Sequence, residues 1–158
     1  MENISLEKTV LTDSDFEEMG WHDSKLYAIA FGMKENEIAF DIDYILKWIN
    51  PQGLENTFKF VVAPATLVFR NVYDLNINTS LTEVIIESIE RSNPVRPKNA
   101  NYIKEQLEYD WRIETTNGEI SFKSVGYEQF FRKNPTLIDQ QHIGLLKRGG
   151  ISFDQGLW

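Results

Sequence analysis

The clearest pattern in the chain is an alternation of apolar and polar positions between residues 38 and 48. Every even position there is apolar, while the odd positions include two aspartates and a lysine. Because successive side chains of a strand point to opposite faces, this period of two predicts a long, half-buried β-strand. An apolar run from Leu26 to Phe31 precedes it, and Gly32–Asn36 has the length of a hairpin connection. The sequence therefore predicts a β-hairpin over residues 25–48.

Short runs with the same period recur after residue 50, separated by turn-forming residues. Pro64 interrupts one apolar stretch, and since proline cannot donate to a sheet ladder we expect two short strands there rather than one. Asn117-Gly118 lies between two alternating runs and predicts a hairpin, because both residues tolerate the positive φ of a type I′ turn. The strands predicted in this part of the chain are 58–62, 65–69, 73–77, 109–113 and 120–124.

Helical signals are few. Thr12, Asp13 or Ser14 can cap a short helix whose first turn carries acidic residues, and Gly20 ends it early. Residues 81–91 carry both a capping-box pattern with a helical apolar stripe and a run of β-branched residues; we favour a strand. The segment Ser92–Asn99 contains two prolines and several turn formers, which predict an irregular loop.

These elements fit one domain. The chain has 158 residues, 42% of them hydrophobic, which suffices for one core and is too little for two ordinary domains. The predicted fold is mainly β, an antiparallel β-sandwich or curled β-roll of about seven to eight strands with one or two short helices. Within this single β-rich domain, 1–158, we expect an N-terminal segment with the short helix at 1–20, an irregular proline-containing loop at 92–100 and a flexible tail at 149–158.

Charge and cysteine content narrow the class of protein. The chain carries 24 acidic and 16 basic residues, a formal charge of -8, and the acidic excess lies before residue 91. This balance argues against nucleic-acid binding and suggests either ordinary solvated surface or an acidic face for a basic partner. The absence of cysteine excludes disulfides, thiolate nucleophiles and cysteine zinc sites. With no apolar run of membrane length and no secretory signal, a cytoplasmic protein is expected.

Four polar residues form the most interesting candidate cluster: His22, Asp23, Asp41 and Asp43. Residues two apart in a strand point to the same side, so Asp41 and Asp43 would converge with side chains from the neighbouring strand. A histidine with two or three carboxylates could bind a divalent metal or carry out proton transfer. The simpler interpretation is that Asp41 and Asp43 are the solvated half of an amphipathic strand.

Two other sets of residues are candidates for binding. Trp21, Tyr102 and Trp158 lie outside the clear strand patterns, where an aromatic ring could anchor a partner, although packing in the core explains each of them as well. A basic cluster flanks the proline segment and could bind an anionic ligand or an acidic partner; solvated loop charge is the simpler explanation. The members of this cluster are Arg91, Arg96, Lys98 and Lys104.

Several short sequence motifs resemble those of a family of small bacterial proteins of unknown function. The resemblance covers residues 21 to 140 and implies no assigned activity or catalytic residue. In size, acidity and lack of catalytic signature the chain is also similar to the small immunity proteins encoded beside polymorphic toxins. The motifs are Trp21-His22-Asp23, Phe40-Asp41-Ile42-Asp43-Tyr44-Ile45, Ala63-Pro64-Ala65-Thr66-Leu67-Val68-Phe69 with Asn71-Val72, Gly118-Glu119-Ile120-Ser121-Phe122 and Gly126-Tyr127.

The sequence favours a non-catalytic protein. Neither a serine-hydrolase elbow nor a phosphate-binding loop is present. The first hypothesis is a protein-binding, immunity-type or accessory factor that works by surface complementarity. The alternative is a metal-binding or hydrolytic site built from His22, Asp23, Asp41 and Asp43, and a small-molecule pocket between sheets is a third. A homo-oligomer formed through a free strand edge also stays open.

Overall fold

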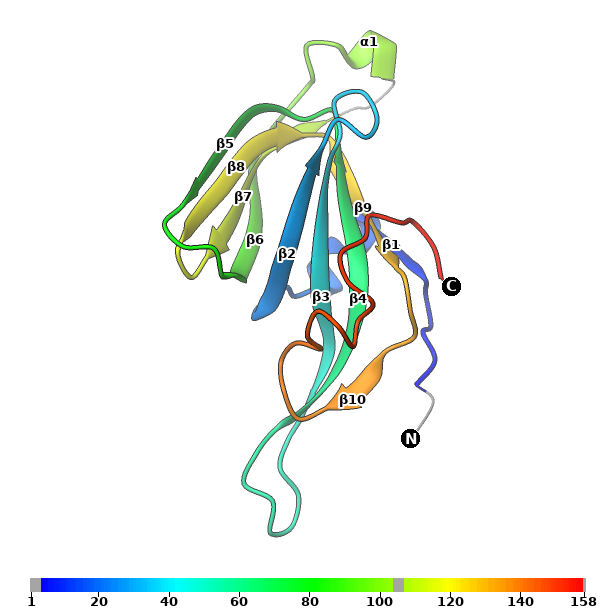
Figure 1. Ribbon diagram of the computed structural model, residues 1–158. Coiled ribbons are helices and arrows are strands. Elements are labelled where there is room, and N and C mark those ends of the chain that lie inside the picture. The colour runs from blue at the N-terminus through cyan, green and yellow to red at the C-terminus, as the bar shows by residue number, and fades with distance from the viewer. Residues whose placement is uncertain (1–3, 104–106, 158) are drawn as a thin grey trace.

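The computed structural model of the protein describes residues 4–103 and 107–157. Within them, one antiparallel ten-stranded sheet curls around a core without closing into a barrel (Figure 1). The strand order is β1-β9-β4-β3-β2-β6-β7-β8-β5, with β10 paired to β4. The mainly β, antiparallel prediction is confirmed, in the form of a curled roll with more strands than expected. The elements are β1 Val10–Thr12, η1 Asp13–Glu18, β2 Ser24–Phe31, β3 Ile38–Ile49, β4 Lys59–Arg70, β5 Tyr73–Thr79, β6 Val84–Val95, α1 Ala100–Ile103, β7 Glu108–Thr115, β8 Gly118–Ser124, β9 Gly126–Phe131 and β10 Thr136–Ile138.

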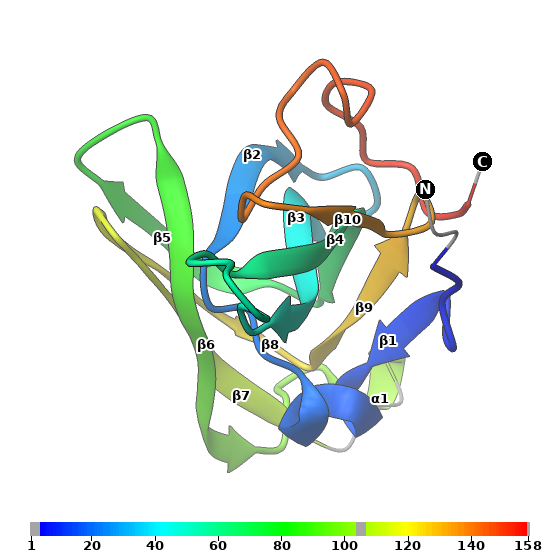
Figure 2. The same ribbon diagram turned by 90° about the horizontal axis from the view of Figure 1, so that it is seen from below.

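The core lies between the two halves of the curled sheet. Seen from below, β6, β7, β8 and β5 face the strands β2, β3, β4 and β9 (Figure 2). Phe69 of β4 joins the halves, because its ring lies 4.7 Å from that of Phe122 on β8 and 5.0 Å from that of Trp111 on β7. All three side chains are almost completely buried. Such edge-to-face aromatic pairs add to the stability already gained by burying their large apolar area.

The predicted N-terminal helix is present as the 3-10 helix η1, preceded by Thr12 as its capping residue. Its Phe16 packs on the core aromatics, 5.6 Å from the ring of Trp111 and 5.9 Å from that of Trp21. Trp21 is only 3% exposed. The short helix therefore covers part of the apolar interior.

β3 is buried on both faces instead of one. Residues 38–45 are all buried, including the polar Asp41 and Asp43. The outer face of β3 and β4 is covered by the segment 139–157, drawn in orange to red in Figure 2. Gly150, Ser152 and Asp154 of this segment are hydrogen-bonded to side chains described below, so the stretch expected to be a flexible tail is fixed to the sheet. The prediction of a half-buried strand is therefore wrong.

β4 is one strand of 12 residues, not two short ones. Its Pro64 is opposite Asp43 of β3 and accepts a hydrogen bond from the backbone N–H of Arg132, beyond the end of β9. In an antiparallel strand the N–H and C=O of one residue point to the same side. The missing N–H of Pro64 therefore faces Arg132, in the interval between β9 and β10, and the ladder between β3 and β4 is not interrupted.

The uncertain segments are also strands. Residues 84–95 form β6, which confirms the strand over most of 81–91 and shows that the irregular loop was predicted too early, because 92–95 still pair with β7. The β7–β8 hairpin is confirmed, but its turn residues are Thr116 and Asn117. Gly118 already pairs with Thr115, with φ +149°. A Cβ there would lie 1.9 Å from the carbonyl oxygen of Asn78, so close approach of β5 requires this glycine.

None of the described helices is long and apolar enough to span a lipid bilayer.

Candidate functional site

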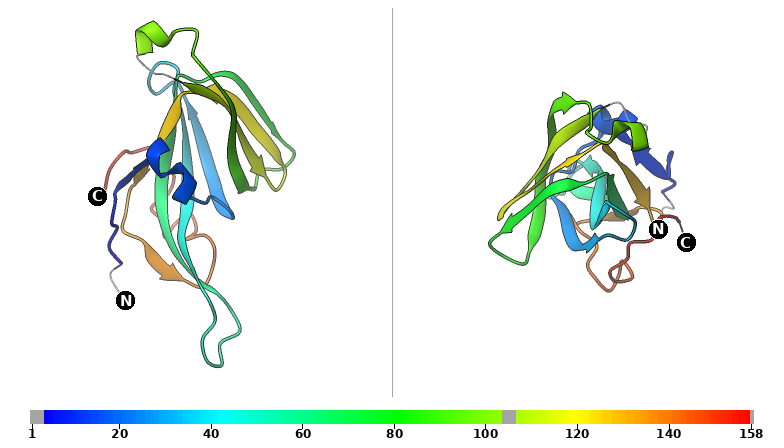
Figure 3. Two further views of the ribbon diagram at one scale, coloured as in Figure 1. Left: turned by 180° about the vertical axis from the view of Figure 1, so that it is seen from behind. Right: turned by 90° about the horizontal axis from the view of Figure 1, so that it is seen from above.

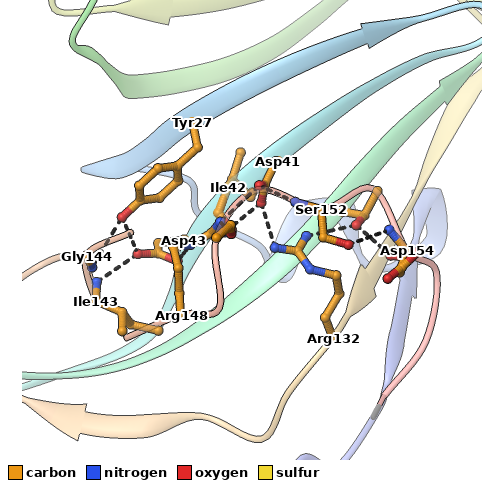
Figure 4. A network of polar contacts seen from close by, with 12 residues as sticks. Tyr27, Asp41, Ile42, Asp43, Arg132, Ile143, Gly144, Arg148, Ser152 and Asp154 are labelled. Carbon is orange, nitrogen blue, oxygen red and sulfur yellow. Dashed lines mark hydrogen bonds and ion pairs between the residues drawn. The ribbon is translucent and has the colours of Figure 1, made fainter. Parts of the chain in front are cut away.

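Asp41 and Asp43 lie side by side on the outer face of β3, as their spacing predicted. Both are fully buried. The side chain of Arg148, from the C-terminal segment, inserts between this face and solvent and is itself 0% exposed (Figure 4). The solvated strand face that the alternating pattern suggested is therefore absent, and a buried ion-pair network takes its place.

Arg148 uses every N–H of its guanidinium. Nε donates to Asp43 at 2.9 Å, while Nη1 and Nη2 donate to the two carboxylate oxygens of Asp41 at 2.9 and 2.6 Å. The remaining two N–H groups reach the carbonyl oxygens of Gly150 at 2.6 Å and Ile42 at 3.2 Å. A guanidinium has five N–H donors in a fixed plane, so this pocket matches its shape and charge completely.

Arg132 supplies the second cation. Its Nη2 donates to Asp41 at 2.7 Å and its Nη1 to the hydroxyl of Thr66 at 2.9 Å, and it is 3% exposed. Asp41 also accepts from the backbone N–H of Ser152 at 3.0 Å. Two arginines and two aspartates balance in charge, which is the condition under which buried ions are tolerated.

Tyr27 completes the network from β2. Its hydroxyl donates to Asp43 at 2.9 Å, and its ring stacks on Arg148 with the guanidinium carbon 4.0 Å from the ring centroid. Burial, followed by the neighbouring Asp43 charge, raises the pKa of Tyr27 above its usual value. Burial alone would lower the pKa of Arg148, but hydrogen bonds and charge from Asp41 and Asp43 raise it. The phenol therefore stays neutral and the guanidinium stays charged.

His22 and Asp23 do not join this network. His22 is exposed, with its Nε2 3.4 Å from Asp23, and it stacks on Trp48 with ring centroids 6.2 Å apart. Asp23 accepts a hydrogen bond from Gln141 at 2.8 Å. In the part of the chain that the structure describes, no group of three or more acidic or histidine side chains is arranged to hold a metal ion.

The structure places the other candidate binding residues in different surroundings. Trp21 is a core residue whose indole N–H donates to the buried Gln129 at 2.8 Å, so its proposed role as an exposed anchor is wrong. Arg96 is exposed and donates to Asn101 at 2.8 Å, and Lys98 is exposed beside a surface hollow. Arg91 lies 4.2 Å from the ring centroid of Phe16. Tyr102 is 90% exposed. Lys104 and Trp158 lie outside the described residues.

The residues that sequence reasoning missed are the partners of the two aspartates. Arg132 and Arg148 lie 91 and 107 positions from Asp41. The one indication of such partners is physical: if β3 is buried on both faces, the carboxylates of Asp41 and Asp43 each require a positively charged partner. Nothing in the local pattern indicates which of the 16 basic residues provides it.

A second feature is the β3–β4 hairpin, which projects from one end of the molecule, opposite α1 (Figure 3). A register shift between Ile45 and Lys47 places Trp48 across from Phe60, with rings 5.0 Å apart. Four large apolar side chains are exposed on this hairpin, one of them Leu46 (38%). The other three, between residues 48 and 58, are called the hairpin patch: Trp48 (41%), Leu54 (100%) and Phe58 (43%).

No protein-family model, curated protein or solved structure matches this chain. The resemblance to small bacterial, immunity-like proteins therefore stays a prediction.

Proposed function

We propose that the protein is a non-catalytic binding factor of the immunity or accessory type, and that it recognises a protein partner through the hairpin patch. The observation that carries this proposal is the exposure of Trp48, Leu54 and Phe58 on a hairpin that projects beyond the sheet. Contiguous exposed apolar patches mark interaction sites, and aromatic side chains are typical binding anchors.

The ring contacts support a preorganised patch. Trp48 lies between other rings, 6.2 Å from both His22 and Phe58, which limits its rotamers before any partner arrives. Less side-chain entropy is then lost on binding. The formal charge of -8 favours a partner with a basic surface, since opposite charge accelerates encounter and selects among partners.

The alternative metal or hydrolytic site has less support. The Asp41 and Asp43 carboxylates are each bonded to Arg148 and sealed from solvent, and His22 lies apart from them. Divalent cations are therefore expected to leave the melting temperature unchanged. A saturable rise in Tm that disappears in the Asp41→Asn/Asp43→Asn variant would revive the metal hypothesis.

The test of the binding proposal is capture of partners from a lysate of the source cells on immobilised protein at low and high salt. We expect one stoichiometric partner that is retained at low salt, weakened at high salt and lost in a Trp48→Ala/Phe58→Ala variant. Leu146→Ala is a matched control, because Leu146 is 94% exposed but lies outside the hairpin. Equal capture by both variants would contradict the proposal.

A further inference from the structure

Two surface hollows at the α1 end of the molecule share a wall made of three asparagines. Asn36, Asn71 and Asn99 line both a hollow of about 390 Å³ and one of about 260 Å³. They come from the β2–β3, β4–β5 and β6–β7 connections, which meet at this end of the sheet (Figure 3). We call the two hollows with this wall the polar groove.

Direct bonds between the connections hold the wall in place. Asn71 and Asn99 exchange two side-chain hydrogen bonds of 3.1 and 2.9 Å. The carbonyl oxygen of Asn36 accepts from the backbone N–H of Val72 at 2.7 Å. The wall is therefore formed before a ligand arrives, which lowers the entropic cost of binding.

The wall retains unused hydrogen-bonding capacity. After their mutual pair, Asn71 and Asn99 each keep one amide N–H and one oxygen lone pair. The side-chain amide of Asn36 has no hydrogen-bond partner in the described part of the chain. Each of the three asparagine side chains can thus both donate and accept a hydrogen bond, which suits ligand groups, such as hydroxyls, that also do both.

Charges of both signs line the larger hollow and its neighbour. Glu35 and Glu37 line the larger hollow and make no ion pair with other described residues. Arg70 lines it too, but is paired with Asp13 at 3.8 Å and with Glu128 at 3.6 Å. Lys98 provides positive charge at the smaller hollow. The Nε of Arg70 is buried and has no hydrogen-bond partner among the described residues. The unpaired carboxylates of Glu35 and Glu37 would repel an anion. No group of three or more acidic or histidine side chains among the described residues is arranged to hold a metal ion. A neutral, strongly hydrogen-bonding ligand therefore fits best.

Tyr102 adds an apolar surface to the larger hollow. Its side chain is 90% exposed, and its backbone N–H donates to Asn99 at 2.9 Å. Exposed tyrosine rings combine an apolar face with a polar tip. From the shared asparagines, the mixed charges and this ring, we propose that the polar groove binds a saccharide, whose hydroxyls each donate and accept and whose C–H face can stack on Tyr102.

The test is titration of the isotope-labelled full chain with glucose, galactose, mannose, N-acetylglucosamine and their disaccharides, followed by NMR. We expect at least one sugar to cause saturable shifts confined to the amides of 35–37, 70–72 and 98–102 at concentrations up to about 20 mM. Tyr102→Ala and Glu37→Gln, which change residues outside the core, should each weaken this binding about tenfold.

Phe58→Ala is the matched control, since Phe58 is an exposed aromatic residue on the opposite end of the molecule. It should leave sugar binding unchanged, which separates this proposal from that of the hairpin patch. The proposal is overturned if no sugar shifts the groove amides, if the two groove variants bind as the unmodified protein does, or if inorganic phosphate alone shifts these amides.

Discussion

Arg148 is the residue on which the outer face of the sheet depends. It satisfies Asp41 and Asp43 together while being fully buried, and the C-terminal segment that carries it reaches β3 through these bonds. Whether a buried ion pair is more stable than an apolar replacement varies, but removing one partner leaves an uncompensated buried charge. The network therefore fixes where the C-terminal segment lies, with Asp41 and Asp43 both bonded to Arg148.

Arg148→Ala is expected to reduce the free energy of unfolding by about 3–5 kcal/mol, because Asp41 and Asp43 would lose their shared cation. Urea unfolding at neutral pH measures this loss. Arg112→Ala is the matched control: Arg112 pairs with Glu114 and Glu119 at 2.7 Å but is 53% exposed, so its loss should cost less than about 1 kcal/mol. Equal effects of the two substitutions would contradict the structural role of Arg148.

Tyr27 predicts a dependence of stability on alkaline pH. Its pKa in the folded protein is raised above the ordinary 10.0, first by burial and then by Asp43, so the unfolded chain loses the phenol proton first as pH rises. The stabilisation is complete below about pH 10 and is lost above it. The stability advantage of the unmodified protein over Tyr27→Phe should therefore shrink above pH 10, as measured by urea unfolding. Parallel stability curves would show that Tyr27 does not titrate in this way.

At the scale of elements, local patterns predicted most strands but not their burial. Period two located β3, β5, β7 and β8, because side-chain alternation depends only on strand geometry, and a continuous apolar run located β2. The pattern could not show that β3 would be covered on both faces, since the covering segment is about 100 residues away along the chain. Asp41 and Asp43 were identified as neighbours because strand geometry places residues two apart on the same face. Their arginine partners were not identified, because they are distant in the sequence.

The structural roles of Pro64 and Gly118 depend on the strands beside them. Pro64 predicted a break, yet β4 continues through it because the missing N–H faces the interval between β9 and β10. Asn117-Gly118 predicted the position of a hairpin, but the turn is one residue earlier and the glycine is required by β5. In both cases the local structure depends on a strand that is distant in the sequence, so the local pattern could not predict it.

Gly118→Ala is expected to destabilise the protein by about 1–3 kcal/mol, since its Cβ would collide with the Asn78 carbonyl and its φ of +149° is unfavourable for alanine. Thermal or urea unfolding measures the change. Gly20→Ala is the control, because nothing lies within 4 Å of a Cβ there and its φ is not positive. If Gly20→Ala were the more harmful substitution, the packing of β5 on Gly118 would be wrong.

At the scale of the whole molecule, the two proposed binding sites are separated in space from the ion-pair network that holds the C-terminal segment on the sheet. The Asp41–Arg148 network is buried under the C-terminal segment. The β3–β4 hairpin, which carries the hairpin patch, projects from one end of the molecule, and the connections that line the polar groove meet at the other (Figures 1 and 3). A substitution in the hairpin patch should therefore abolish recognition while leaving the fold intact.

The measurement that tests the account most directly is the affinity of the captured partner, purified and titrated by calorimetry against the unmodified protein and against Trp48→Ala/Phe58→Ala. The account predicts that the variant still unfolds in one cooperative transition, with a loss of unfolding free energy below about 3 kcal/mol because both rings are partly exposed. It should bind at least about 100-fold more weakly, because two aromatic anchors are lost. A variant that folds normally and binds with unchanged affinity would contradict recognition through the hairpin patch.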